Sequence, residues 1–232
     1  MQPNRLDAIG MLDCLDERSK GELEKRCRWR RFKAGKRIVE RNSGDSDVYF
    51  VAEGAVRVVN HSMTGREIAL ARLQRGGYFG EISAIDGLLR SASVVALEDC
   101  LLASLAPRIF IDTLIKHPAM AIQVLSCLAD IIRGCDERIM DLSTLGAVER
   151  VFRQLLRLAE ESPVNPGQWL IPALPTHKVI AAMASTTRET VARNMSQLAK
   201  AGIVERKGRV LFIRDREQLE NLTGVLEVEP PR

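Results

Sequence analysis

The stretch from Phe79 to Ala92 restricts the possible folds most, because its polar groups suit a small phosphorylated ligand. Gly80 has no Cβ, so a ligand can approach the backbone closely there. Glu81 to Ile85 fit one short helical turn, and the free N–H groups at its start, including that of Ile82, favour an anion. The sequence therefore predicts an anion site inside a β-rich domain.

Two further side chains of this stretch suit the same ligand. Arg90 follows Glu81 by nine residues, and its planar fork of donors fits a phosphate. Ser91 adds a hydroxyl donor, and the small Ala92 follows. Glu81 cannot bind an anion, so we expect its carboxylate to accept hydrogen bonds from sugar hydroxyls. Cyclic nucleotides carry both a phosphate and a ribose hydroxyl.

This stretch closely resembles the phosphate-binding cassette of cyclic-nucleotide-binding domains, in which Phe-Gly-Glu and Arg-Ser-Ala occur at this spacing. The resemblance implies that Glu81 takes the ribose 2′-hydroxyl, while Arg90, Ser91 and nearby backbone N–H groups take the cyclic phosphate. The ligand-binding set that it implies here is Gly80, Glu81, Ile82, Arg90, Ser91 and Ala92. Arg90→Leu is then expected to weaken nucleotide binding and to leave the fold intact. The alternative is a strand–turn–strand with a surface Glu–Arg pair, and some relatives keep the scaffold but sense another effector.

Length and composition restrict the wider class of protein. The 232 residues suffice for one large or two ordinary domains, and a net charge of +4 means that nucleic-acid affinity must come from local clustering. No continuous apolar run approaches the roughly 18 residues of a membrane span, and the N-terminus lacks the apolar core of a signal peptide. We therefore expect a cytoplasmic protein without a membrane partner.

Cysteines and histidines give no pattern for a metal site. The five cysteines are odd in number and include no C-x-x-C pair, so a disulfide framework is not expected. Oxygen-sensing relatives hold an iron–sulfur cluster with closely spaced N-terminal cysteines, whereas Cys14 and Cys27 are too few and too far apart. The three histidines have no metal-ligand spacing, so ordinary surface histidines are expected, the alternative being that one of them is a haem ligand. We expect no metal, no iron–sulfur cluster and no catalytic residues.

Short apolar segments separated by glycines dominate the first half of the chain. Residues 5–27 favour short helices, and strands are predicted at 49–51, 55–59 and 68–73, with turn glycines such as Gly65 between them. The series predicts a β-roll like that of cyclic-nucleotide-binding domains, and the segment from Gly44 to Gly54 resembles that family's pattern upstream of the cassette.

A long helix is predicted over about residues 118–144. Leu125, Ile132 and Ile139 share one heptad position, and a second position is shared by Ala121, Leu128, Cys135 and Leu142. Such an a/d stripe favours a coiled-coil seam, the alternative being a helix packed only on its own domain. In the resembled family this helix is the dimer interface and contacts the nucleotide base, so we prefer a parallel homodimer.

The base-contacting positions depart from the family pattern. Members that bind cyclic AMP carry a Thr-Ser pair where this chain has Cys135 and Asp136. The adenine amino group can donate to Asp136, but guanine offers two adjacent donors on its Watson–Crick edge, which suits a carboxylate better. Cyclic AMP and cyclic GMP therefore both remain candidate ligands, and the alternative is that Asp136 simply faces solvent.

The last third of the chain predicts a winged helix-turn-helix. Gly146 marks a hinge, and a helix is expected from Ala147 to Glu160. Further helices are predicted at His177–Met183 after a Thr176 cap, at Thr187–Ala201, and from Asp215 through Leu222, with a hairpin of 203–206 and 210–213. The expected fold is α+β: a sensor domain, residues 1–145, and a DNA-binding domain, residues 146–232.

The start of the second helix carries the DNA-reading chemistry. Arg188, Glu189 and Arg193 share its N-terminal face, where Arg suits guanine and Glu suits the cytosine amino group. Expected phosphate contacts are Thr187, Thr190, Lys178, Lys207 and Arg209. The buried face should include Val191, Leu198 and Ile203. The alternative is a solvated charged face.

This string resembles the recognition helix of the cyclic-AMP receptor protein subfamily, which belongs to the cyclic-AMP receptor protein/fumarate–nitrate regulator family of bacterial transcription regulators. The Arg-Glu-x-x-x-Arg of that subfamily reads a TGTGA-like half-site. The turn before it, where Gly is common, has Ser185, which is expected to need left-handed geometry. The resemblance implies a cyclic-nucleotide-responsive homodimer on palindromic double-stranded DNA, with RNA polymerase as a further partner. The alternatives are a ligand-independent DNA-binding protein, a sensor of another effector, and a phosphodiesterase. Hydrolysis would need metal ligands or a clear nucleophile and base, which the sequence does not indicate.

Overall fold

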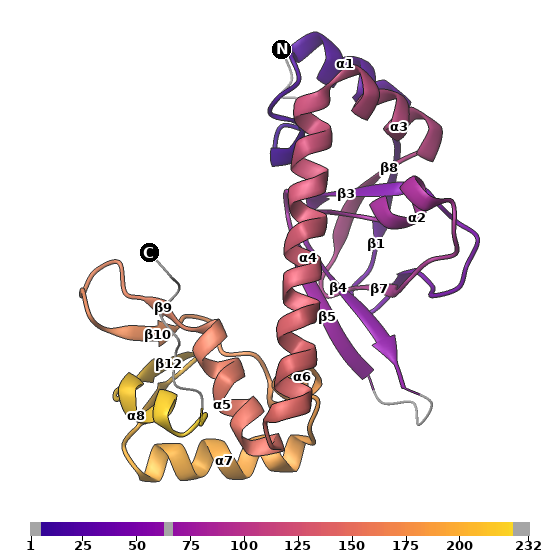
Figure 1. Cartoon of the computed structure of the whole chain (residues 1–232). Helices are drawn as coiled ribbons and strands as arrows, with labels where there is room; N and C mark the ends of the chain where they lie inside the picture. Colours follow the sequence, from indigo (N-terminus) through magenta and orange to yellow (C-terminus); the bar gives the residue numbers. More distant parts are fainter. Residues whose placement is uncertain (1–5, 63–66, 225–232) are drawn as a thin grey trace, which may run out of the picture. The chain divides into compact units, whose positions relative to one another are not determined.

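The computed structural model describes residues 6–62 and 67–224, and it divides into two compact units, Met1–Arg133 and Gly134–Arg232 (Figure 1). Residues 1–5, which include the first residue of the predicted helical stretch 5–27, lie outside the described residues, as does the predicted turn residue Gly65. The functional boundary between residues 145 and 146 stays a prediction.

Short helices open the first unit, as predicted for residues 5–27. They are η1 (Gly10–Leu12) and α1 (Glu17–Arg26). Asp16 caps α1, because its Oδ1 accepts a hydrogen bond from the Ser19 N–H at 2.6 Å. Leu23 then faces the core of the unit.

Two antiparallel four-stranded sheets follow and form the predicted β-roll. The first sheet has the order β1 (Arg28–Phe32), β8 (Cys100–Leu105), β3 (Val48–Glu53) and β6 (Tyr78–Phe79). The second has the order β2 (Arg37–Val39), β7 (Ser93–Ala96), β4 (Ala55–His61) and β5 (Glu67–Gln74). Val51 and Leu102 of the first sheet share one core with Val56 and Val94 of the second.

Helices cover the other face of the first sheet. Phe50 of β3 and Leu105 of β8 pack there with Phe110 of α3 (Pro107–Lys116) and Val124 of α4 (Pro118–Thr144). Because β3 and β8 are buried on both faces, their sequences are nearly continuous apolar runs rather than alternating ones.

The helix α4 confirms the long helix predicted over residues 118–144. Leu125, Ile132 and Ile139 are exposed to 59%, 60% and 60%. The sequence has no continuous apolar run of membrane-spanning length, but within the described residues α4 is long and apolar enough, by length and composition alone, to span a membrane. The apolar window of α4 is 11% buried. Exposed apolar side chains repeating every seven residues equally fit a seam between two helices.

The second unit has the predicted order of helix, turn, helix and hairpin, with two strands that the sequence did not indicate. Its elements are α5 (Ala147–Leu158), β9 (Glu160–Glu161), β10 (Trp169–Ile171), α6 (His177–Met183), α7 (Arg188–Lys200), β11 (Val204–Lys207), β12 (Val210–Ile213) and α8 (Arg216–Asn221). The helix expected to reach Glu160 ends at Leu158, because Glu160 and Glu161 pair with β10.

The caps and core of this unit agree with the sequence pattern. Thr176 accepts from the Val179 N–H, and Asp215 accepts from the Gln218 N–H. The predicted core residues Val191, Leu198 and Ile203 are buried. The strands form one sheet in the order β11-β12-β10-β9.

Candidate functional site

The cassette starts where β6 leads into the short helix α2 (Glu81–Asp86). Gly80 caps α2 with φ 95°, a left-handed conformation that favours glycine. A Cβ at this position would lie 2.5 Å from Nη1 of Arg90 and 2.6 Å from the carbonyl oxygen of Asp47. The space beside Gly80 is therefore filled by Arg90 and by backbone of the 45–47 loop, which gives the glycine a role that the sequence did not indicate.

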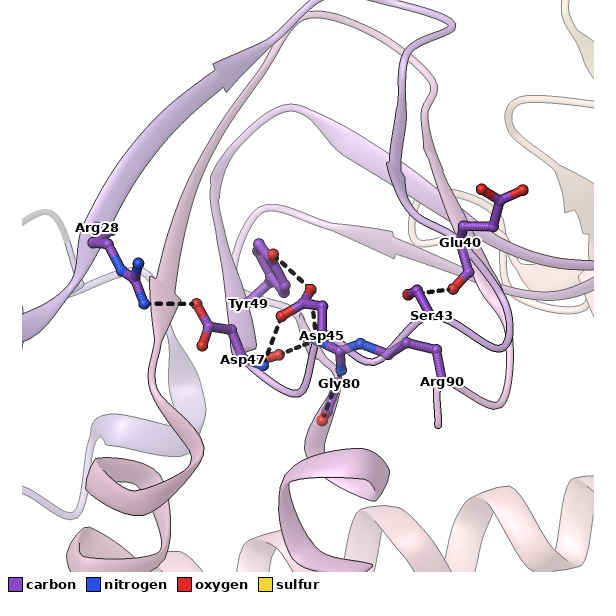
Figure 2. A network of polar contacts seen from close by, with 8 residues as sticks. All are labelled: Arg28, Glu40, Ser43, Asp45, Asp47, Tyr49, Gly80 and Arg90. Carbon is purple, nitrogen blue, oxygen red and sulfur yellow. Dashed lines mark hydrogen bonds and ion pairs between the residues drawn. The ribbon is translucent and has the colours of Figure 1, made fainter. Parts of the chain in front are cut away.

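The guanidinium of Arg90 is buried, with the residue 3% exposed, and it bonds to two other segments of the chain. Its Nη2 donates to Oδ2 of Asp45 at 3.0 Å and to the carbonyl of Asp47, and its Nη1 donates to the carbonyl of Gly80 at 3.1 Å. Figure 2 shows this guanidinium ending between the 45–47 loop and the start of α2. Its central carbon also lies 5.8 Å from the ring centroid of Tyr49, within cation–π range.

Asp45 is a residue of this site to which the sequence pattern assigned no role. It accepts hydrogen bonds from Arg90, from the hydroxyl of Tyr49 at 2.9 Å and from the Asp47 N–H at 3.0 Å. Burial raises the pKa of the Asp45 carboxyl, but the bonds from Asp47, Arg90 and Tyr49 outweigh it and hold the pKa below its usual value. The signal in the sequence was the family-like Gly44-Asp45, although its partner lies 45 residues away.

Burial changes what the loss of Arg90 should do. The expectation that Arg90→Leu leaves the fold intact is revised, because that change removes the donor from two backbone carbonyls and a carboxylate. One nitrogen of the group is left over: within the described residues, the buried Nε of Arg90 has no hydrogen-bond partner. Such a donor is suited to an acceptor that the chain itself does not supply.

Glu81 lies beside this arginine and is also buried, at 7% exposed. Burial raises the pKa of its carboxyl, against the N–H groups of Glu81 and Gly80 and the charge of Arg90, which lower it. Ile82 is half-buried, Ala92 is buried, and Ser91 is exposed. The structure thus brings Gly80, Glu81 and Arg90 together, while the roles of the whole implied set stay a prediction.

The predicted base contacts lie elsewhere in the chain. Cys135 and Asp136 are exposed on α4 and belong to the second unit. Their contact with a nucleotide stays a prediction. Among the described residues, no three His, Cys, Asp or Glu side chains cluster as a metal site. Cys27 is buried, and burial raises the pKa of its thiol to about 12.

The start of α7 presents the predicted DNA-reading side chains to solvent. Arg188, Glu189 and Arg193 are exposed. Thr187 caps the helix: its Oγ1 accepts from the Thr190 N–H at 3.2 Å and lies 3.0 Å from the Thr190 hydroxyl. The N–H of Glu189 and the Thr187 hydroxyl lower the pKa of the Glu189 carboxyl, which keeps it charged as an acceptor.

The predicted phosphate contacts outside α7 are exposed as well. They are Lys178 on α6 and Lys207 and Arg209 on either side of the wing turn. The amine of Lys207 pairs with Glu205 at 3.2 Å, so part of its charge is already compensated. The carbonyl of Arg209 accepts from the Leu174 N–H at 2.9 Å, which joins the wing to the segment before α6.

The turn between α6 and α7 has the geometry expected from the sequence. Ser185 has φ 51°, which confirms the left-handed conformation. Sequence reasoning missed the two side chains that hold this turn, Arg138 of α4 and Arg150 of α5. Both arginines are distant in sequence from the turn, and each lies in a helix with other charged residues, so no local pattern singles them out.

Comparison with known proteins gives consistent matches in both halves. Residues 29–117 match the family model of a cyclic nucleotide-binding domain, and residues 149–222 match that of a Crp-like helix-turn-helix domain. A cyclic AMP receptor protein of Thermus thermophilus is 34% identical over 194 residues, 83% of this chain and 87% of that protein. A CRP-like cAMP-activated global transcriptional regulator of Mycobacterium tuberculosis is 25% identical over 189 residues, 81% of this chain and 84% of that protein. The solved structure of a CooA mutant from Carboxydothermus hydrogenoformans has the same fold, with a TM-score of 0.77 and 24% identity over 94% of this chain and 96% of that chain.

Proposed function

This chain belongs to the cyclic-AMP receptor protein/fumarate–nitrate regulator family of DNA-binding transcription regulators, and we propose that it is a homodimer that responds to a cyclic nucleotide. The observation that carries the proposal is the buried Arg90 beside the buried Glu81 at the start of α2. The relatives are transcription regulators rather than enzymes. We place the protein in the cytoplasm, with RNA polymerase as its further partner.

The cassette has the donors and the acceptor that a cyclic nucleotide needs. The buried Nε of Arg90, with the hydroxyl of Ser91 and the first N–H groups of α2, provides donors for the cyclic phosphate. The carboxylate of Glu81 provides an acceptor for the ribose 2′-hydroxyl. Because Arg90 is only 3% exposed, the phosphate reaches Nε only after a local rearrangement of the cassette.

The homodimer is supported by α4. Leu125, Ile132 and Ile139 form an exposed apolar row with a seven-residue spacing, and two such rows would cover one another in a parallel pair. Two recognition helices about 34 Å apart then fit successive major grooves of a palindromic TGTGA-like site. A ligand promotes this only by binding the DNA-competent arrangement more tightly than the other.

Calorimetric titration with cyclic AMP and with cyclic GMP, separately, tests the ligand. We expect binding of one of them, and a preference for cyclic GMP that Asp136→Asn removes would assign the base contact to Asp136. The 2′-deoxy form of the preferred nucleotide should bind more weakly to the wild type, and Glu81→Gln should lose most of that difference. Glu22→Gln, an exposed change on α1, is the control. If neither nucleotide binds the wild-type protein, the nucleotide proposal is wrong.

The second candidate function is DNA binding under another effector or without one. It is favoured by Arg90, most of whose donors already bond to Asp45, Asp47 and Gly80. Fluorescence anisotropy with a labelled palindromic TGTGA duplex distinguishes the two functions. Tight binding that no cyclic nucleotide changes would favour the second candidate.

A further inference from the structure

Two arginines from outside the helix-turn-helix hold the turn that precedes the recognition helix. Arg150 of α5 donates through Nε to the Ala184 carbonyl at 2.9 Å and through Nη2 to the Ser185 carbonyl at 3.3 Å. Arg138 of α4 donates through Nη2 to the Ala182 carbonyl at 3.4 Å and to Oγ of Ser185 at 3.1 Å. A charged side chain of α4 therefore bonds directly to the turn.

Ser185 has a conformation that a glycine would adopt with less strain. Its φ of 51° lies in the left-handed region, which β-carbons disfavour. Serine differs from glycine here by the hydroxyl that accepts from Arg138. The Ser185 side chain thus adds strain to the turn and also forms the hydrogen bond that links the turn to α4.

The neighbouring contacts make α4, α5 and the turn one block. Arg157 of α5 pairs with Glu137 at 3.1 Å and with Asp141 at 2.5 Å, both on α4, and Arg153 lies 3.9 Å from Asp141. Arg150 also bonds to the Leu145 carbonyl at 2.7 Å, at the junction of the two helices. Arg138 lies three residues after Cys135, one helical turn along α4.

We propose that Arg138 is a positioning residue for DNA recognition, which fixes α7 to α4 through Ser185 and Ala182. A displacement of α4 then moves the turn and the start of α7 with it. This inference rests on the proposed function, because it uses α4 as the element that a ligand displaces. It goes beyond that function by naming the bonds that carry the displacement.

Four variants test the inference. Arg138→Met removes both bonds at similar side-chain length, whereas Arg138→Lys keeps a donor that can reach the same acceptors. Ser185→Gly removes the hydroxyl but keeps the turn geometry. Arg133→Met, an exposed arginine on the same helix, is the control for loss of one positive charge.

The main readout is the ratio of DNA affinities with and without the bound nucleotide, measured by anisotropy. We expect Arg138→Met to reduce this ratio about fivefold or more, and Arg138→Lys to restore most of it. Ser185→Gly should give a smaller loss, and adding it to Arg138→Met should cost little more, because the two changes remove the same bond. Arg133→Met should leave the ratio unchanged.

A lower thermal stability of Arg138→Met with an unchanged affinity ratio would overturn the inference, since Arg138 would then be merely structural. A wild type without any nucleotide response shows instead that the proposed function fails. In that case the test is hydrogen exchange of the 184–187 amides together with DNA affinity in the absence of nucleotide. Arg138→Met must then speed exchange and weaken DNA binding, and wild-type behaviour in both measurements would overturn the inference.

Discussion

Arg90 in the cassette and Arg188 at the start of α7 are both expected to donate hydrogen bonds to a ligand, a cyclic phosphate for Arg90 and a guanine of DNA for Arg188. The two side chains differ in how the protein positions them. Arg90 is 3% exposed and bonded to Asp45, Asp47 and Gly80. Arg188 is exposed, and what is fixed at its position is the backbone, through the Thr187 cap. One region positions the side chain itself, whereas the other positions the helix that carries it.

The difference suits the sizes of the two ligands that we propose, a cyclic nucleotide and DNA. A small anion offers few contacts, so a donor fixed in advance saves the entropy of ordering a long side chain on binding. A DNA groove offers many acceptors over a long surface, and an exposed arginine can adjust to the base that it meets. Stability and recognition should therefore be coupled at Arg90 and separate at Arg188.

The largest effect is expected from the same substitution at both arginines. Arg90→Leu should lower the free energy of unfolding by about 3 kcal/mol, because a carboxylate and two carbonyls lose their donor. Arg188→Leu should change it by less than about 0.5 kcal/mol. Urea denaturation measures both, and equal effects would remove the distinction between the two regions.

The next effect concerns DNA specificity. Arg188→Ala should cost roughly 1–3 kcal/mol at one guanine of the half-site and relax the preference there. Lys178→Ala should weaken binding about equally on every sequence and reduce its salt dependence, as expected for a phosphate contact. Anisotropy with single-base variants of the duplex separates these outcomes. A uniform loss in Arg188→Ala would make Arg188 a phosphate contact as well.

A smaller effect is expected for Asp45→Asn, at about 1 kcal/mol of unfolding free energy at pH 7, since 37% of the Asp45 side chain is exposed and its charge is partly screened. The pKa of Asp45 is lowered in the folded protein, so its contribution is present above the ordinary value of 3.8 and is lost as pH falls through the lowered pKa. The gap between wild type and variant should therefore close in acid. A gap that stays constant down to pH 2 would show that the carboxylate charge does not stabilise the cassette.

The smallest effect is expected at the helix start. Thr187→Ala should cost about 0.5 kcal/mol of unfolding free energy, the low end for loss of a cap, because the Thr190 N–H loses its acceptor; Thr187→Ser should cost less still. DNA affinity of Thr187→Ala should fall together with protection of the first α7 amides from hydrogen exchange. Lower affinity with full protection would instead assign Thr187 to direct phosphate contact.

Local signals explain how much could be predicted. The helix α6 was predicted at its observed bounds, because Thr176 is a strong cap and the residues after it are apolar at helical spacing. The left-handed Ser185 followed from its place in the turn. The motif residues Gly80, Glu81 and Arg90 lie within one stretch of chain, so their grouping was visible in the sequence.

Contacts between distant segments explain what could not be predicted. Glu160 and Glu161 look helical, and their pairing with Leu170 and Trp169 overrides that preference. Asp45 and Arg90 are 45 residues apart, and Arg138 and Ser185 are 47 apart, so no local pattern joins them. The burial of Arg90 was missed for the same reason, because an arginine is ordinarily an exposed residue.

The wing, which is the hairpin of β11 and β12, is stiffened by the sheet that it belongs to, and this affects how it can bind. The hairpin of β11 and β12 is continued by β10, and the Arg209 carbonyl is bonded to the Leu174 N–H. A free hairpin would lose about 1–2 kcal/mol per residue of backbone freedom when it settled on a phosphate. Here most of that loss occurs during folding. If Lys207 and Arg209 contact DNA as proposed, only their side chains have to become ordered on binding. The wing should then meet the DNA backbone as a rigid edge rather than as a loop that closes after contact.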